Sequence, residues 1–144
     1  MKRISSLLFI VLMALALFAQ GDVPAHHNQP PKKGEKLPAL LPQEALWGPS
    51  FSHPVQVRAY ELAAKIPDVL YQLPCYCHCD RTVGHTSLRS CYESTHAAHC
   101  SACMKELFYA YQMTKKGKSA AQIRAGVIRG EWEKVDLETA ASIR

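Results

Sequence analysis

The chain has 144 residues, of which 48% are hydrophobic and 20% charged, and its formal net charge is +5. This length allows one globular domain and excludes a large multidomain enzyme. Without Lys2 and Arg3, which belong to a predicted leader, the net charge is only +3, a balance that does not indicate a nucleic-acid partner.

Residues 1–20 are predicted to be a secretory signal peptide. Lys2 and Arg3 give a positive start, residues 7–19 form an apolar run, and Ala19 is a small residue suited to cleavage. Because the run is too short to span a bilayer, we expect no stable membrane span after cleavage and a soluble product, periplasmic or secreted. Export places the cysteines in an oxidising environment, where thiols either pair or bind a metal ion.

Residues 21–50 are predicted to be a Pro-rich tether. This segment holds six prolines together with Lys32 and Lys33. Such a composition does not favour a packed core, and His26 and His27 within it are interpreted as polar linker residues.

A first helix is predicted to begin near Ser52, whose hydroxyl can cap it, with Pro54 in its opening turn. Pro67 should kink or divide this helix, because proline cannot donate a hydrogen bond to the carbonyl four residues earlier. Pro74 should end it. Apolar residues recur at spacings of three and four along it, and they predict one buried face: Val55, Ala59, Leu62, Ile66, Val69 and Leu73.

Two further helices are predicted after residue 99. One begins at Cys100 or Ser101, carries a buried stripe that includes both Cys100 and Cys103, and ends near Gly117. The next begins at Ser119, because Ser119 and Gln122 form a capping box. Residues 51–133 are therefore predicted to be one helical, Cys/His-rich domain, followed by a short tail at 134–144.

These patterns predict an all-α fold: a small three-helix or four-helix bundle with a long Cys/His-rich loop between helices one and two. No run alternates long enough for a sheet. The loop, residues 74–99, is too long to lie without order inside a compact domain. Some additional constraint is expected to order it.

All six cysteines fall within 29 consecutive positions, together with His78, His85, His96 and His99. The first three form a C-x-C-x-C pattern, in which neighbouring thiols form disulfides only with strain. Alternate residues of an extended segment could instead direct their thiols toward one or more metal ions. Thiolates with some imidazole select Cu(I) or Zn(II). The candidate metal ligands are Cys75, Cys77, Cys79, His85, Cys91, His96, Cys100 and Cys103.

Other interpretations of the cluster remain open at this stage. Small exported domains often use disulfides or a structural metal as staples, and six cysteines allow 15 pairings. Mixed occupancy by disulfides and metal is a further alternative. Another is an interaction module in which a metal is only structural. No nucleotide, phosphate or haem motif indicates enzymatic chemistry, so a non-enzymatic role is favoured.

The residues Pro74-Cys75-Tyr76-Cys77-His78-Cys79, followed by His85, Cys91, His96 and the pair Cys100 and Cys103, resemble a bacterial family named for its PCYCGC motif. The resemblance extends from about residue 60 to residue 132. It implies an exported protein of unassigned function whose signature positions are these cysteines and histidines. This chain has His78 where the family has glycine, and it lacks the lipid-bearing cysteine that many members carry.

Residues 117–124 are similar to the closing helix of periplasmic thiol proteins of cytochrome c maturation. Those proteins are three-helix bundles with a reactive cysteine pair between the first two helices. The resemblance implies an alternative function, a periplasmic thiol-disulfide or cytochrome-assembly partner that uses Cys100 and Cys103, with the other cysteines in structural disulfides. A periplasmic protein partner is expected in that case.

Overall fold

The computed structural model describes residues 22–143, so the predicted signal peptide lies outside the described residues. Within that range the chain is all-α and has no strand, which confirms the predicted fold class. The α-helices are α2 (Pro54–Ala63), α3 (Pro67–Tyr71), α4 (Cys79–Thr82), α5 (Ser101–Lys115), α6 (Ala120–Ile128) and α7 (Leu137–Ala140). Four 3₁₀ helices accompany them: η1 (Gln43–Trp47), η2 (Leu88–Tyr92), η3 (Thr95–His99) and η4 (Glu131–Lys134).

The predicted first helix is divided by Pro67 into α2 and α3, as expected from the missing backbone donor of proline. Its start differs by one residue from the prediction. His53, and not Ser52, is the N-cap, and the Gln56 side chain accepts a hydrogen bond from the His53 backbone N–H at 2.8 Å. Pro54 consequently occupies the first helical position, where its fixed φ and its lack of an N–H group cost nothing.

The helices after residue 100 follow the sequence prediction. Cys100 is the N-cap of α5, and Gly117 beyond its end adopts a φ of +75°, which only glycine adopts without strain. The capping box of Ser119 and Gln122 is formed at the start of α6. The predicted tail contains the short helix α7.

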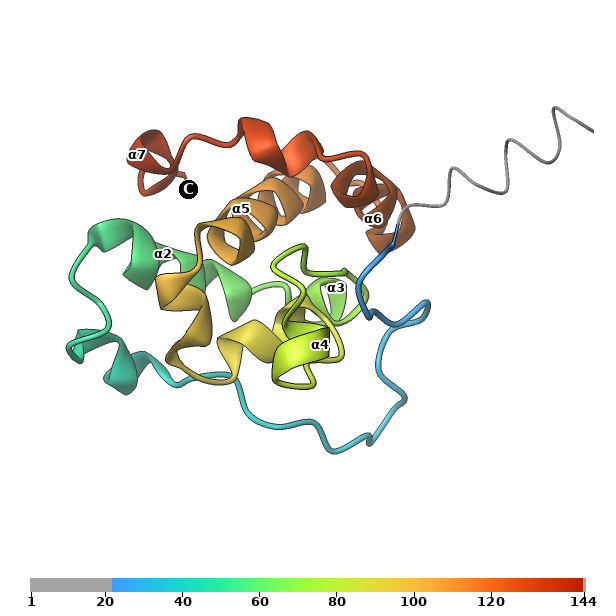
Figure 1. Cartoon of the computed structure of the whole chain (residues 1–144), viewed down its shortest axis with the longest axis horizontal. Helices are drawn as coiled ribbons and strands as arrows, with labels where there is room; N and C mark the ends of the chain where they lie inside the picture. Colours follow the sequence, from blue (N-terminus) through green and yellow to red (C-terminus); the bar gives the residue numbers. More distant parts are fainter. Residues whose placement is uncertain (1–21, 144) are drawn as a thin grey trace, which may run out of the picture.

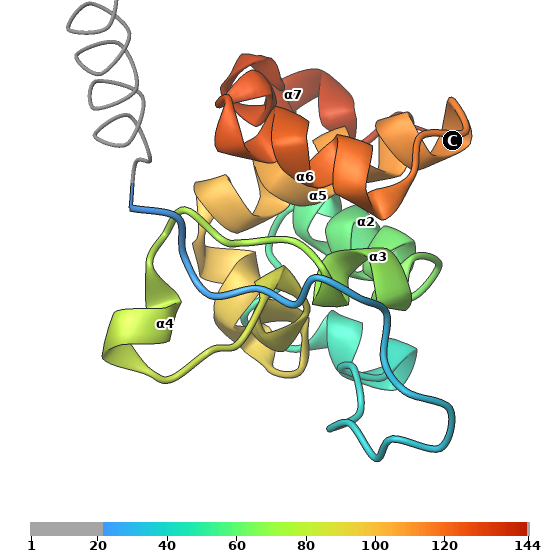
Figure 2. The same cartoon turned by 90° about the vertical axis from the view of Figure 1, so that its right-hand side faces the viewer.

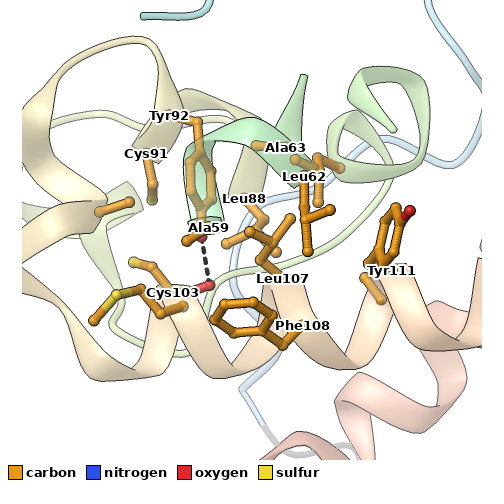
Figure 3. Packing of buried hydrophobic residues seen from close by; sticks show 14 of the residues in the cluster. Ala59, Leu62, Ala63, Leu88, Cys91, Tyr92, Cys103, Leu107, Phe108 and Tyr111 are labelled. Atoms are coloured by element: carbon orange, nitrogen blue, oxygen red, sulfur yellow. Dashed lines mark hydrogen bonds between the residues drawn. The ribbon is translucent and has the colours of Figure 1, made fainter. Parts of the chain in front are cut away.

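α5 is the central helix and packs against both α2 and α6 (Figure 1). The core between α2 and α5 is built from Leu62, Leu107 and Phe108, none of which is exposed to solvent (Figure 3). Tyr92 is also fully buried there, and its hydroxyl donates a hydrogen bond to the Cys103 carbonyl oxygen at 2.9 Å. Core and cysteines therefore share one continuous packed interior.

The predicted tether lies along the surface of the helical domain in both views (Figures 1 and 2). Leu46 in η1 is buried, and the Leu41 N–H donates to the Tyr92 carbonyl oxygen at 2.9 Å. His27 stacks on Tyr71 with ring centroids 3.8 Å apart. The segment thus has the sparse secondary structure of a tether, yet its backbone and side chains contact the domain.

Among the described residues, no helix combines the length and the apolar character that a membrane crossing requires.

Candidate metal centre

The cysteines and histidines of the predicted loop lie on several short elements between α3 and α5. Cys75 and Cys77 follow α3, and Cys79 is the first residue of α4. Cys91 belongs to η2 and His96 to η3. The long connection is therefore ordered as a series of short helices, α4, η2 and η3, that carry most of these side chains (Figure 2, α4 and the yellow segment).

The CYC segment forms a turn and not the extended strand that alternate spacing suggested. The His78 N–H donates to the Cys75 carbonyl oxygen at 3.1 Å, and His78 itself has a φ of +54°. The left-handed residue reverses the chain so that Cys79 starts a new helix. The three thiols approach one another across this turn.

Side chains of α2 hold the part of the loop that carries His96. The Tyr60 hydroxyl donates to the Ser94 carbonyl oxygen at 2.7 Å and accepts from the Ala98 N–H at 3.2 Å. Gln56 donates to the Ala98 carbonyl oxygen at 2.8 Å. These buried hydrogen bonds fix both ends of η3 against α2.

The six cysteines are free thiols, and most of their sulfur atoms converge. The Cys77 sulfur lies 3.1 Å from that of Cys75, 2.6 Å from that of Cys79 and 3.6 Å from that of Cys103. The sulfurs of Cys75 and Cys103 are 3.3 Å apart. Cys77 thus has three thiol neighbours and is not paired with one of them alone.

The two histidines predicted as ligands each contact a thiol. The His96 Nε2 atom is 3.0 Å from the Cys79 sulfur, and the His85 Nδ1 atom is 3.2 Å from the Cys91 sulfur. Their rings are 4.9 Å apart. Gly84, with a φ of +73°, turns the chain after α4 so that His85 reaches this position.

Three groups of these residues could hold a metal ion, because the ligand atoms within each group lie within 4.8 Å of one another. The first group is Cys75, Cys77, Cys91 and Cys103; the second is Cys77, Cys79 and His96; the third is Cys79, His85 and Cys91. Seven of the eight predicted ligands are therefore brought together. The donor set of thiolates and imidazoles suits a soft or borderline ion.

Hydrogen bonding among the thiols places negative charge at the centre of the cluster. Hydrogen bonds with Cys100, Cys103 and Cys75 lower the pKa of Cys77 far below its ordinary value. The pKa of Cys103 is raised, because its hydrogen bonds with Cys100 and Cys75 favour its protonated form. One thiolate surrounded by donor thiols is a starting state from which a metal ion can displace protons.

Burial favours the neutral form of the His85 imidazole. Desolvation lowers the pKa of His85, and the nearby His96 lowers it further. A neutral imidazole has the free lone pair that a metal ion requires.

Cys100 is the one predicted ligand outside the three groups. It is half-buried at the N-cap of α5, whereas Cys103 in the first turn is fully buried. His78 and His99 also lie outside the groups, and His99 is exposed.

Glu106 is a site residue that sequence reasoning missed. It is fully buried on α5, and its carboxylate accepts a hydrogen bond from the Tyr76 backbone N–H at 2.7 Å. Burial raises the pKa of Glu106 to about 8, so the carboxyl is largely neutral at pH 7. Its position within the apolar stripe of α5, between Cys103 and Leu107, was the available signal, because an acidic residue at a core position is unusual.

Comparison with known families gives one match. Residues 43–133 match a family described as "Protein of unknown function with PCYCGC motif". The motif corresponds to residues 74–79, where His78 replaces its glycine. No curated protein and no solved structure matches the chain.

Proposed function

The chain belongs to the family of proteins of unknown function with the PCYCGC motif, and we propose that it is an exported, non-enzymatic metal-binding protein. In this proposal its thiolates and imidazoles hold Cu(I) or Zn(II) for storage, for delivery or for structural closure of the loop. The ligands are the seven grouped residues: Cys75, Cys77, Cys79, His85, Cys91, His96 and Cys103.

The observation that carries the proposal is the convergence of sulfur atoms from separate elements on one centre. Disulfide staples hold thiols in separate pairs, each with one partner. Here Cys77 has three sulfur neighbours within 3.6 Å, and Cys79 lies close to both a thiol and an imidazole. Shared neighbours of this kind are typical of ligands around metal ions.

Export is supported by the leader pattern of residues 1–20. A thiol-rich protein in an oxidising compartment needs protection against unwanted pairing, and metal ligation provides it. Periplasmic location, copper and zinc are parts of the same proposal.

The test is native mass spectrometry of the mature protein, purified from its exported compartment without chelator or reductant. We expect additional mass that is lost on denaturation, after which the cysteines react with an alkylating reagent. A protein with three disulfides, no additional mass and no free thiols would contradict the proposal.

A second candidate function, thiol-disulfide exchange with a periplasmic partner, is favoured by one observation. Cys100 is half-buried at the amino end of α5, and Cys103 is fully buried one turn later. An accessible attacking thiol and a buried resolving thiol have this arrangement in exchange reactions.

Replacing Cys103 with serine separates the two functions. Exchange predicts a trapped mixed disulfide between Cys100 and the partner, because the resolving thiol is gone. Metal binding predicts weaker binding of the ion and no trapped partner. Non-reducing gel electrophoresis of the exported fraction, with Cys100→Ser as the matched control, distinguishes these outcomes.

A further inference from the structure

The three candidate metal groups overlap in a specific way. The first and second share Cys77, the second and third share Cys79, and the third and first share Cys91. Each pair of groups therefore has one residue in common, and the three shared residues close a ring. The other members each belong to a single group: Cys75 and Cys103 to the first, His96 to the second and His85 to the third.

The chemistry of the shared positions fits this ring. A thiolate sulfur has several lone pairs and can bind two metal ions at once, whereas a neutral imidazole offers one lone pair. All three shared residues are cysteines, and both histidines are unshared. A neutral histidine at a shared position would bind only one of the two ions.

We infer that the site holds three Cu(I) ions in a ring bridged by the thiolates of Cys77, Cys79 and Cys91. This inference rests on the proposed metal-binding function and names its cargo. Cys75 and Cys103 complete the first ion's ligands, His96 those of the second and His85 those of the third.

Ligand number selects Cu(I) over Zn(II) for the whole ring. The second and third groups offer two thiolates and one imidazole each, and Cu(I) is stable with three such ligands. Zn(II) prefers four ligands in a tetrahedron, which only the first group supplies from protein side chains, whereas the second and third groups would leave the fourth position to a water molecule. Zn(II) alone is therefore expected to bind tightly at one position.

Loading requires no electron transfer when copper arrives as Cu(I). All five cysteine sulfurs bind as thiolates, those that are still thiols release their protons to solvent as three Cu⁺ ions bind, and the sulfurs change no oxidation state. Cys75, Cys79, Cys91 and Cys103 are each at most 4% exposed, whereas the bridging Cys77 is half-buried. Both histidines are half-buried, and His85 lines a cavity of about 320 Å³.

The test is an anaerobic titration of the reduced, full-length mature protein with Cu(I), followed by native mass spectrometry. We expect saturation at three copper ions, and at one ion when Zn(II) is the probe. A single Cu(I) at saturation would overturn the ring while leaving the metal-binding function intact. Failure to bind either ion would overturn the metal-binding function itself.

Single variants test the sharing of thiolates. Cys79→Ser removes a ligand common to the second and third positions, so we expect one copper ion to remain. His96→Gln removes a ligand of the second position alone and should leave two. The matched control, His99→Gln, changes an exposed histidine outside the groups and should retain three.

Equal losses in Cys79→Ser and His96→Gln would overturn the bridging assignment, as would loss of copper in His99→Gln. Circular dichroism establishes whether each variant is folded. If Cys79→Ser is unfolded, the double variant His85→Gln/His96→Gln replaces it. That variant keeps every cysteine, and the ring predicts that it retains one ion in the four-thiolate group.

Discussion

His78 is a residue other than glycine with a positive φ, +54°, in the turn between Cys77 and Cys79. A side chain in the left-handed region costs roughly 1–2 kcal/mol, because its Cβ approaches the following carbonyl oxygen. The PCYCGC motif has glycine at this position, and glycine avoids the strain because it has no Cβ. This chain tolerates histidine there at a cost in stability.

We predict that His78→Gly stabilises the reduced, metal-free protein by about 0.5–1 kcal/mol. The relief of left-handed strain exceeds the greater freedom that glycine gives the unfolded chain. Urea denaturation measures the difference. His78→Ala is the control, since it removes the ring but keeps a Cβ, and a stabilisation equal to that of His78→Gly would contradict the backbone explanation.

Glu106 makes the stability of the metal-free protein depend on pH. Its pKa is raised by burial to about 8, above the 4.5 of an ordinary glutamate, so the folded state retains a proton that the unfolded state releases. The free energy of unfolding must therefore fall as pH rises between these two values.

Glu106→Gln should remove this dependence while keeping an oxygen that accepts from the Tyr76 N–H. We expect the variant to gain stability relative to wild type as pH rises from 5 to 7.5, by up to about 1.4 kcal/mol per pH unit. Denaturation curves at several pH values measure it. The exposed Glu138 gives the control Glu138→Gln, and a pH-independent difference for Glu106→Gln would contradict the explanation.

Most members of the three candidate groups could be named from the sequence, because cysteine and histidine are rare and are concentrated in one segment. The sequence did not indicate which ligands are shared. That property depends on the turn at His78 and on the return of the chain at Gly84. Cys100 illustrates the limit, since its spacing to Cys103 resembles a ligand pair although it lies outside the metal groups.

Helix boundaries were predictable where a local signal determines them. Pro67 divided the first helix, and Ser119 with Gln122 began α6. Ser52 was a wrong choice of cap, because Pro54 at the first helical position makes His53 the N-cap. The hydrogen bonds from α2 to η3 were not predictable, since they join residues 34 to 42 positions apart.

Among the contacts between elements, the Tyr60 hydroxyl has the clearest expected effect. We predict that Tyr60→Phe destabilises the fold by about 1–3 kcal/mol, because the Ser94 carbonyl and the Ala98 N–H each lose a partner. Looser attachment of η3 should also weaken Cu(I) binding at the proposed position that includes His96. Thermal unfolding and competition with a Cu(I) chelator measure these two effects.

Tyr111→Phe is the matched control for Tyr60→Phe. Tyr111 is a buried tyrosine of α5 whose hydroxyl makes no hydrogen bond with the described residues. The free energy of unfolding of Tyr111→Phe should differ from that of the wild type by no more than about 0.5 kcal/mol. Equal effects of the two variants would show that the hydroxyl contacts of Tyr60 are not responsible.

At the scale of the whole molecule, the contacts of the Pro-rich segment with the helical domain could not be predicted from its composition. Its prolines carry no periodicity, and residues 22–50 contain only the short helix η1. Its docking depends on contacts with distant residues, such as the His27–Tyr71 stack and the hydrogen bond from Arg124 to the His27 carbonyl oxygen at 3.0 Å. Contacts between residues so far apart along the chain leave no pattern in a single sequence.

The metal centre joins elements from both sides of the long loop, so loading should stabilise the whole domain. A ligand that binds only the folded state at 100 times its Kd adds about 2.7 kcal/mol. We therefore predict that Cu(I) raises the Tm and that a Cu(I) chelator reverses the rise. Hydrogen exchange should slow most across residues 75–103, and uniform slowing with no emphasis there would contradict a local centre.

The stack of Trp132 on Tyr76, with ring centroids 6.3 Å apart, gives the centre an intrinsic optical reporter. Tyr76 lies between Cys75 and Cys77, whereas the chain's other tryptophan, Trp47, is 84% exposed and lies on η1. In a Trp47→Phe variant, fluorescence should come from one indole, which stacks on a residue of the CYC segment. We predict that Cu(I) quenches this emission and that the signal becomes constant at three equivalents, so the filling of the centre can be followed continuously without added dye.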